Sequence, residues 1–229
     1  MSSSIELNNV SHGFQVNKDR ITLFNRLNLS IHQGQTTSLV GPSGSGKSTL
    51  LSLLGGLEEP TSGSVVYYKS GQSQPLFLLK QHSGFIFQQF HLLPELDALS
   101  NVLLPLKLRG DKDALKKAKR WLKRVSMEHR FQHRPHQLSG GEQQRIAIAR
   151  ALCTEPDFVF ADEPTGNLDA QTARTIAELL MELASERNVG LVLVTHNENM
   201  AQQCDRRYYL NQGALSMFHD KEEEQHETE

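Results

Sequence analysis

The sequence predicts an α/β protein with a group of helices inserted into it, and three observations support this fold class. A glycine-rich loop separates a strand-like apolar run from a helical pattern within residues 36–54. Two more apolar runs of strand length, Phe158–Ala161 and Leu191–Thr195, follow in the second half of the chain. Helical periodicity fills most of residues 98–152. The alternation of strands and helices is therefore interrupted by helices and then resumes.

The remaining elements follow from the hydrophobic pattern and from turn residues. Strands are expected at Ile5–Val10, Leu23–Ile31, Thr36–Val40, Ser64–Tyr68 and Phe85–Phe87. Helices are expected at Lys47–Leu54, Ala98–Leu108, Asp113–Val125, Glu142–Leu152, Ala170–Glu186 and Asn199–Gln203. Ser70–Pro75 reads as a polar loop, and Asn211–Gly213 reads as the turn of a closing hairpin between Tyr208–Leu210 and Leu215–Phe218. The acidic segment 219–229 has no periodicity and is predicted to be disordered.

Composition narrows the class of protein. The chain has 229 residues, which suits one large α/β domain or a core with a subdomain. Its formal net charge of −2 gives no overall field that would attract nucleic acid, so no nucleic-acid partner is expected. No apolar run approaches the ~18 residues of a membrane span, and the N-terminal residues lack the pattern of a signal peptide. Cys153 and Cys204 do not suggest a disulfide framework; both are interpreted as reduced thiols in or near the core of a cytosolic protein.

The glycine-rich loop has the spacing of a phosphate-binding loop. It reads G-x-x-x-x-G-K-S-T and comprises Gly41, Pro42, Ser43, Gly44, Ser45, Gly46, Lys47, Ser48 and Thr49. Glycines allow positive φ and bring backbone N–H groups close to an anion, and the following helix N-terminus adds partial positive charge. Lys47 can reach the β- and γ-phosphates of a nucleotide, and Ser48 can ligate Mg²⁺. The sequence therefore predicts a nucleotide site with Mg²⁺.

Two carboxylates follow the apolar run Phe158–Ala161. Asp162 is predicted to hold Mg²⁺, usually through water, and Glu163 to polarise the water that attacks the phosphate. Ligands of open α/β sheets collect at the carboxyl ends of strands, which is where both residues lie in the predicted fold. The alternative is an acidic helix cap after a strand, and the glycine-rich loop in the same chain argues against it.

A second anion-binding surface is predicted at residues 138–142, which read Leu-Ser-Gly-Gly-Glu and open a predicted helix. Ser139 and the N–H groups of Gly140 and Gly141 lie at that helix N-terminus, where an anion is stabilised. The glycine-rich loop alone is found in many nucleotide hydrolases. With the Leu-Ser-Gly-Gly-Glu motif added, the chain resembles the ATP-binding-cassette (ABC) ATPases.

The resemblance covers nearly the whole chain, residues 5–218, and it implies the architecture. The fold class expected from it is α/β, with a P-loop NTPase (RecA-like) core, an antiparallel β subdomain and an inserted α-helical subdomain. The implied division is a core at residues 1–87 and 153–218, a helical subdomain at 88–152 and an acidic tail at 219–229.

The resemblance also implies roles for four further positions. Phe14 matches the aromatic residue that stacks on adenine, and the alternative is a plain core phenylalanine. Gln88 matches the glutamine that contacts Mg²⁺ and links the core to the helical insertion. Asp169 belongs to Asn167-Leu168-Asp169, which matches the loop that touches the opposite subunit. His196 matches the histidine that contacts the γ-phosphate, although a lone histidine at a strand end is usually structural.

These roles imply a working unit of two chains. ATP would be held by the glycine-rich loop of one subunit and covered by Ser139 of a second copy, which gives a head-to-tail homodimer with two sites. Lys47, Glu163 and His196 would be the catalytic side chains, acting through positioning and charge stabilisation. Because the chain has no membrane span, transport would need integral membrane permease subunits, which would dock on the helical insertion near Gln88. The protein would then lie on the inner face of the cell membrane.

Residues 87–102 and 160–169 look like a particular bacterial group of these ATPases. The group includes the ATPases of lipoprotein-releasing and macrolide-exporting transporters, whose membrane partners carry a large extracytoplasmic domain. The chain departs from the group between Val66 and Gly84, where relatives usually have a longer segment with an arginine shortly before the glycine. Here that segment is brief and carries Lys80.

Two other features have simpler interpretations. His129, His133 and His136 have a metal-like spacing, but Pro135 interrupts the helix and no cysteine or carboxylate cluster accompanies them. The basic run at residues 116–124 fits a helix with one buried and one solvated face. The alternatives are that the solvated face contacts anionic lipid headgroups or that it contacts nucleic acid.

Two functions compete with that of a transporter ATPase. One is a soluble ABC ATPase with a non-transport role in DNA repair or on ribosomes, and the absence of sustained heptads and of a second cassette argues against it. The other is a regulatory nucleotide switch that does not turn over, which Glu163 and His196 argue against.

Overall fold

The computed structural model describes residues 2–16 and 19–218. The acidic segment predicted to be disordered, residues 219–229, lies outside the described residues. The described chain contains two sheets, and the larger has six strands in the order β10-β9-β3-β8-β7-β6, all parallel except β10. Its strands are β3 (Thr36–Val40), β6 (Ser83–Phe87), β7 (Phe158–Asp162), β8 (Gly190–Val194), β9 (Arg206–Asn211) and β10 (Ala214–Met217). The predicted buried strands and the closing hairpin are confirmed.

The smaller sheet is antiparallel, in the order β2-β1-β4-β5. Its strands are β1 (Ser3–Val16), β2 (Asp19–His32), β4 (Ser62–Lys69) and β5 (Gln72–Gln74). The prediction of a loop at Ser70–Pro75 is wrong, because Lys69 pairs with Gln72 across a two-residue turn. Ser70 and Gly71 have φ of 56° and 76°, and two residues of positive φ make the turn that best matches strand twist.

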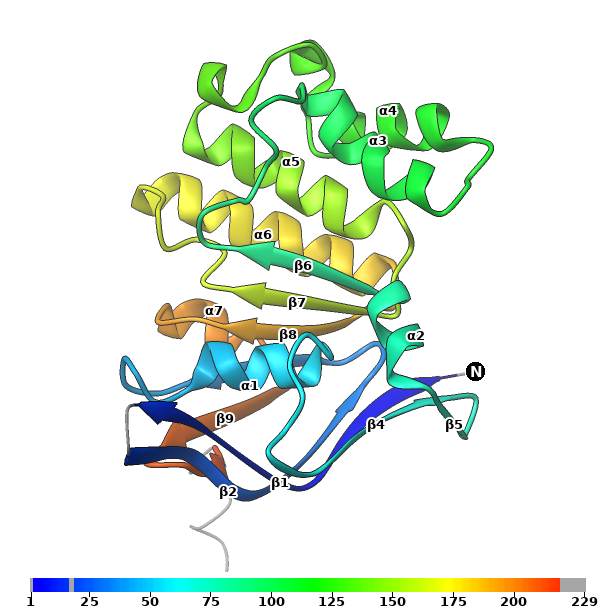
Figure 1. Ribbon diagram of the computed structural model, residues 1–229. Helices are drawn as coiled ribbons and strands as arrows, with labels where there is room; N and C mark the ends of the chain where they lie inside the picture. The colour runs from blue at the N-terminus through cyan, green and yellow to red at the C-terminus, as the bar shows by residue number, and fades with distance from the viewer. Residues whose placement is uncertain (1, 17–18, 219–229) are drawn as a thin grey trace, which may run out of the picture.

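The predicted helices are present, with small shifts at their ends. They are α1 (Lys47–Leu54), α3 (Ala98–Leu108), α4 (Ala114–Arg124), α5 (Gly140–Leu152), α6 (Ala170–Glu186) and α7 (Glu198–Gln202). Two short 3₁₀ turns, η1 (Glu128–Arg130) and η2 (Pro135–Gln137), lie between α4 and α5. The six-residue helix α2 (Leu76–Gln81) was not predicted. Figure 1 shows α3, α4 and α5 beyond the β6 edge of the sheet, so the helical insertion forms one end of the molecule.

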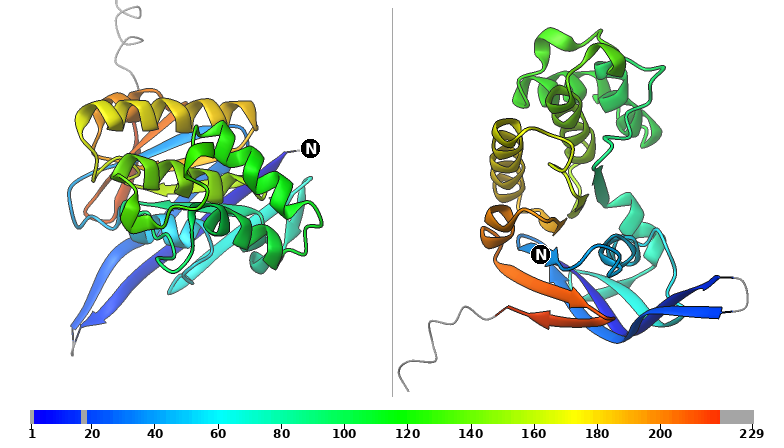
Figure 2. Two further views of the ribbon diagram at one scale, coloured as in Figure 1. Left: turned by 90° about the horizontal axis from the view of Figure 1, so that it is seen from above. Right: turned by 90° about the vertical axis from the view of Figure 1, so that its left-hand side faces the viewer.

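Alternating side chains of the parallel strands feed two hydrophobic cores. One core lies between the larger sheet, α1 and the antiparallel sheet, and it contains Phe158, Phe160, Val192 and Val194. The other reaches α3, α4, α5 and α6, and it contains Val159, Ala161, Leu191 and Leu193. Figure 2 shows α6 on one face of the sheet and α1 on the other. Strands buried on both faces explain the continuous apolar runs in the sequence.

The thiols of Cys153 and Cys204 are buried, as predicted. Burial raises the pKa of Cys153 to about 12 and that of Cys204 to about 11, which keeps both thiols protonated at neutral pH. The Cys153 Sγ also lies 3.4 Å from the carbonyl oxygen of Val102, as a donor. Both residues therefore contribute packing rather than reactivity.

Asp157, just before β7, ties the antiparallel sheet to the parallel one. Its Oδ2 accepts hydrogen bonds from Tyr67 Oη (2.6 Å) and Ser3 Oγ (2.9 Å) and lies 3.1 Å from Lys69 Nζ. Burial by itself raises the pKa of this carboxyl, but the three partners outweigh burial and hold the pKa below its ordinary value.

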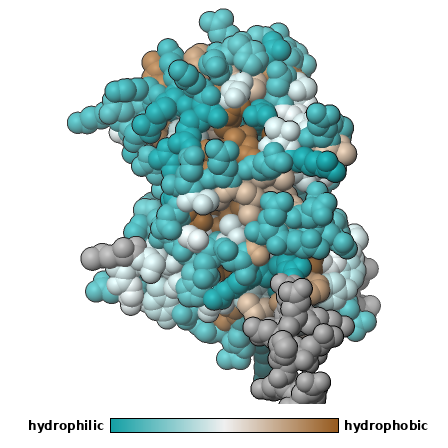
Figure 3. All heavy atoms as spheres, turned by 180° about the vertical axis from the view of Figure 1, so that it is seen from behind, coloured by the Kyte–Doolittle hydropathy of each residue, from teal (hydrophilic) through white to brown (hydrophobic). Residues whose placement is uncertain are grey.

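Figure 3 shows that the face opposite to that of Figure 1 is covered mainly by hydrophilic side chains, with smaller hydrophobic areas between them. Within residues 2–16 and 19–218, no helix has the length and apolar character needed to cross a membrane.

Candidate nucleotide-binding and catalytic site

The glycine-rich loop joins β3 to α1, and its backbone depends on glycine at two positions. Gly46 is the N-cap of α1 with φ of 95°, and a Cβ added there would lie 2.8 Å from the Phe24 ring. A Cβ on Gly41 would lie 2.1 Å from the carbonyl oxygen of Leu210. Side chains are therefore excluded on both sides of the loop, and the free N–H groups of α1 face the loop from its N-terminal end.

Lys47 is the first residue of α1, and its side chain bends back along the loop. The ammonium donates to the carbonyl oxygens of Gly41 (3.0 Å) and Pro42 (2.8 Å). Burial lowers the pKa of Lys47, while the negative charges of Glu163 and Asp162 act in the opposite direction. The cation is thus held inside the loop, where a phosphate group would meet it.

Asp162 and Glu163 follow one another at the end of β7 but point to different partners. Ser48 Oγ donates to Asp162 Oδ1 over 3.1 Å, so the first turn of α1 reaches the first carboxylate. Glu163 has φ of 47°, and its N–H donates to the carbonyl of Val194 at 2.9 Å. The left-handed backbone at Glu163 directs the two consecutive carboxylates to different partners.

His196 lies beside Glu163, just beyond the end of β8. Its backbone N–H donates to Glu163 Oε2 over 3.3 Å, and its Nε2 is 3.2 Å from Oε1. Burial is the largest influence on Glu163 and raises its pKa; Asp162 adds to that rise, whereas His196 and Lys47 oppose it. A carboxyl whose pKa is raised toward neutrality is suited to accept a proton from water.

Lys47, Ser48, Glu163 and His196 line one pocket of about 350 Å³, whereas Asp162 is not among its lining residues and reaches it only through Ser48. It is lined by Phe14, Leu23, Ser43, Gly44, Gly46, Lys47, Ser48, Thr49, Glu163, Val194 and His196. Phe14 is 45% exposed at the rim and is therefore not a core residue, which removes the alternative interpretation of it. The structure thus brings together residues from the first strand, the glycine-rich loop and the ends of β7 and β8.

The predicted second surface lies elsewhere in the chain. Ser139 caps α5 by accepting from the N–H of Glu142 (3.2 Å), and the Glu142 carboxylate accepts from the N–H of Ser139 (2.8 Å). Burial raises the pKa of Glu142, but those bonds and Arg130 hold it below its ordinary value. This surface borders a pocket of about 370 Å³ that also includes Gly141. Among the residues that the structure describes, none lines both this pocket and the one at Lys47.

Asp169 borders the second pocket but is already used by its own helix. It caps α6 by accepting from the N–H groups of Gln171 (3.1 Å) and Thr172 (3.0 Å), and hydrogen bonds from Thr172 and Gln171 lower its pKa. An aspartate directly before the helix predicted at Ala170–Glu186 is a typical N-cap, so the sequence carried a signal for this structural task that the functional interpretation did not use.

Gln88, one residue beyond β6, is paired with Asn167 instead of lining the Lys47 pocket. Gln88 Nε2 donates to Asn167 Oδ1 (3.1 Å), and Asn167 Nδ2 donates to the Gln88 carbonyl (3.0 Å). Gly166 lies under the pair, since a Cβ there would be 2.8 Å from Gln88 Nε2. The side chain of Gln88 is thus bound to the segment that leads into Asp169.

Comparison with known proteins decides the family. The profile of the ABC transporter family matches residues 24–166. The chain belongs to the ABC transporter family. It is 47% identical over 208 residues to the lipoprotein-releasing system ATP-binding protein LolD of Hahella chejuensis (87% of this chain, 89% of that protein). It is 44% identical to LolD of Acinetobacter baylyi over 217 residues (91% and 95%).

A solved structure extends the match to the fold of this ABC ATPase. It is the dimeric, post-hydrolysis state of the ATP-binding cassette MJ0796 bound to ADP and Pi. The two share 37% sequence identity with a TM-score of 0.82, covering 94% of this chain and 99% of that chain. A second dimeric structure of MJ0796 aligns with a TM-score of 0.81 and 39% identity. The ABC cassette fold and the ATPase class predicted from the sequence are therefore confirmed.

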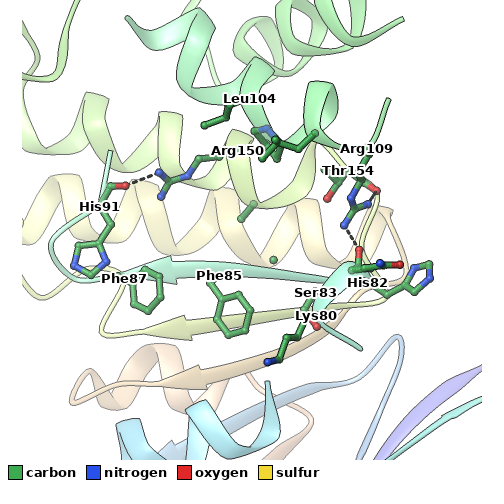
Figure 4. Close-up of a pocket in the computed structure, with 15 residues that line it drawn as sticks. Lys80, His82, Ser83, Phe85, Phe87, His91, Leu104, Arg109, Arg150 and Thr154 are labelled. Atoms are coloured by element: carbon green, nitrogen blue, oxygen red, sulfur yellow. Dashed lines mark hydrogen bonds between the residues drawn. The ribbon is translucent and has the colours of Figure 1, made fainter. Parts of the chain in front are cut away.

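This ABC ATPase also has a groove of about 850 Å³ that sequence patterns did not reveal. It lies between α2 and β6 on one side and α3 and α5 on the other, as Figure 4 shows. Arg109 crosses one end, donating to the carbonyls of Thr154 and Gln81. The lining carries five basic or imidazole side chains, namely Lys80, His82, His91, Arg109 and Arg150. Among the described lining residues there is no aspartate or glutamate.

Proposed function

We propose that the pocket at Lys47 binds and hydrolyses ATP, and that each predicted residue acts as follows. The loop N–H groups and Lys47 hold the phosphates, and Phe14 stacks on the adenine. Glu163 polarises the attacking water, while His196 contacts the γ-phosphate. The observation that supports the proposal is the convergence of Phe14, Lys47, Glu163 and His196 on one pocket.

The residues around Ser48 suit a magnesium ion. Ser48 Oγ and Asp162 Oδ1 are 3.1 Å apart, and both are hard oxygen donors of the kind that Mg²⁺ prefers. Gln88 would add its side-chain oxygen after leaving Asn167. When bound, Mg²⁺ would offset the negative charge that gathers on the β- and γ-phosphates.

The chain's own groups supply the rest of the chemistry. The oxygen of the attacking water forms a bond to the γ-phosphorus while the bond between that phosphorus and the ADP oxygen breaks. Glu163 accepts a proton from this water, and the products are ADP and phosphate. Lys47 and the loop N–H groups stabilise charge on the leaving oxygens. His196 fixes the Glu163 carboxylate through the contacts described above.

Two copies are needed for a complete site. Ser139 and Gly141 line a different pocket from the one at Lys47, which supports the proposal that the Ser139–Gly141 surface covers the nucleotide of a second chain. The MJ0796 cassettes are dimeric in both solved structures, which agrees with a head-to-tail homodimer. Loss of the γ-phosphate after hydrolysis would weaken the shared interface.

The partner outside the dimer is proposed to be an integral membrane permease with an extracytoplasmic domain. The similar proteins in Hahella and Acinetobacter carry the name of the lipoprotein-releasing system, so lipoprotein release is the process that they suggest. The groove between α2 and α3 is the proposed docking place, where residues 88–152 would act as a subdomain that moves with the permease. The ATPase would then sit on the cytoplasmic face of the membrane.

Two exposed leucines give a matched test of this docking. Leu108 lines the groove and is 79% exposed, whereas Leu115 on α4 is 50% exposed and lies outside it. The ATPase would be co-expressed with candidate permease subunits and purified from detergent. We expect L108E to lose the permease and L115E to keep it, with both variants folded by circular dichroism. Equal retention by both variants would place docking elsewhere, and no co-purification with the parent would favour a non-transport role.

A further inference from the structure

The segment between β6 and α3 has an unusual backbone. Phe90 and His91 are consecutive residues with φ of 62° and 46°. Side-chain-bearing residues rarely adopt this left-handed conformation, so two in a row persist only where the surroundings hold them.

Arg150 holds this turn. It lies near the end of α5 and donates from Nη2 to the carbonyl of Phe90 (2.8 Å) and from Nη1 to the carbonyl of His91 (2.5 Å). Figure 4 shows the guanidinium reaching across to His91 within the groove. The Arg150 side chain therefore binds the carbonyl oxygens of both residues with left-handed backbone, and it also lines the proposed docking groove.

The same turn also contacts the beginning of α5. A Cβ placed on Gly140 would lie 3.5 Å from Phe90 Cζ and 3.2 Å from Leu168 Cδ2, so the Phe90 ring rests beside the Leu-Ser-Gly-Gly-Glu motif. Arg150 and Gly140 are roughly 15 Å apart along the helix at 1.5 Å per residue. The turn therefore spans from the groove, where Arg150 grips its backbone, to the motif, where Phe90 packs.

We infer that Arg150 is a positioning residue that sets the Ser139–Gly141 surface for the second subunit through the Phe90 ring. The inference rests on the proposed ATP-dependent dimer. It adds a series of contacts, from Arg150 through Phe90 to Gly140, by which an occupant of the groove would influence dimer formation. Arg150 is one of the residues that line the groove, so a segment seated there can contact it, and in this inference a change at that contact moves Phe90 relative to Gly140. Arg150 does not line the Lys47 pocket, so we expect binding of ATP to a single chain not to require it.

The test uses the full chain with Glu163→Gln, which is expected to accumulate the ATP dimer. Adding Arg150→Ala should raise the ATP concentration for half-maximal dimer formation roughly tenfold, because only part of the free energy of the two charged hydrogen bonds is transmitted to the Ser139–Gly141 surface. Affinity of the single chain for a fluorescent ATP analogue should stay within roughly twofold of the parent. Arg150→Lys keeps the charge with fewer donors, so the ATP concentration for half-maximal dimer formation should lie between those of the parent and of Arg150→Ala. Arg120→Ala removes an exposed arginine of α4, 3.8 Å from Glu155, and should behave as the parent.

Several outcomes would overturn the inference. Unchanged dimerisation of the Arg150→Ala variant is one, and an equal loss of single-chain ATP affinity is another. If that variant does not fold, Phe90→Ala removes the ring and keeps the Arg150 contacts, and normal dimerisation of that variant would have the same meaning.

Hydrogen exchange separates this inference from the proposed dimer. We expect Arg150→Ala to speed exchange at residues 88–92 and also at 138–142 in the single chain. Faster exchange confined to 88–92 would show a purely local role and would contradict the inference. If the Glu163→Gln parent fails to dimerise with ATP, the proposed dimer is wrong, and the exchange result still decides whether Arg150 positions the motif.

Discussion

Glu163 and His196 meet at the ends of neighbouring parallel strands, with the imidazole Nε2 3.2 Å from Glu163 Oε1 and the His196 N–H 3.3 Å from Oε2. Both carboxylate oxygens are thereby oriented by one residue. Because burial raises the pKa of Glu163 while His196 opposes that rise, the proton affinity of the proposed base is set by a balance that substitution can shift.

Replacing Glu163 by glutamine should stop turnover and leave ATP binding intact. The amide keeps the size of the side chain but cannot accept the proton, so phosphate release should fall by ~10²–10⁴-fold. Size-exclusion chromatography with ATP should show an accumulated dimer. Retained hydrolysis without extra dimer would remove Glu163 from the proposed role.

The pH dependence of turnover should report the Glu163 carboxyl. Glu163 must be ionised to act as a base, so a raised pKa means that activity is lost on acidification at a higher pH than an ordinary glutamate would give. The His196 imidazole lowers the pKa of Glu163, so removing it in His196→Ala should raise that pKa and shift the acid limb of the pH profile to higher pH. The measurement is kcat across pH for both proteins, each normalised to its own plateau. An acid limb that moves downward would contradict the assignment.

Lys47→Ala should largely abolish nucleotide binding. A hydrogen-bonded charge of this kind contributes about 1.5–3 kcal/mol, so the affinity for ATP should fall roughly 10–100-fold. Isothermal calorimetry measures the loss, and Lys116→Ala on the exposed face of α4 is the control. Equal affinity in the two variants would place the phosphates away from the glycine-rich loop.

Phe14→Ala should weaken ATP binding, whereas Phe14→Tyr should not. An aromatic stack contributes about 0.5–1.5 kcal/mol beyond area burial, which corresponds to roughly a 2–10-fold change in Kd. Phe77 on α2 is exposed to 60% and lies outside the pocket, so Phe77→Ala serves as the matched control. If ATP and triphosphate alone lose affinity equally in Phe14→Ala, the ring does not contact the base.

Asp157→Asn should destabilise the fold in a pH-dependent way. The folded-state pKa of Asp157 is lowered, so its contribution is present above the unfolded pKa of about 3.9 and is lost as pH falls through the folded value. The Asp157 side chain is 14% exposed and solvent partly screens its charge, so the cost at neutral pH should be about 1–2 kcal/mol in the free energy of unfolding. Urea unfolding of both proteins should show the difference shrinking below about pH 4. A difference that is constant with pH would assign the effect to packing.

Sequence patterns predicted the elements around the glycine-rich loop because each has a strong local signal. Thr36–Val40 is a strand whose three central residues are buried and which ends in Leu39 and Val40, and Gly46 ends the loop. Ser139 with Glu142 makes a capping box that the spacing already indicates. Helix α2 was missed because six residues with four consecutive apolar positions, Leu76–Leu79, show no helical period. The strand β5 was missed because three polar residues carry no alternation.

The contacts that complete the site have no local signal at all. Gln88 and Asn167 are 79 residues apart, and Arg150 is 59 residues from the His91 carbonyl that it binds. Such pairs arise only once the parallel strands have placed their carboxyl ends side by side, so the motifs predict which residues gather but not how they are held.

Consecutive residues of β7 and β8 pack in different parts of the protein, because odd-numbered positions belong to one hydrophobic core and even-numbered positions to the other. Enlarging Ala161 would push against the core that α5 shares, whereas truncating Phe160 would leave a cavity in the core that contains α1. A shift of one residue in the pairing of either strand would move each of its side chains into the opposite core. Such a shift would therefore disrupt the packing of both cores together.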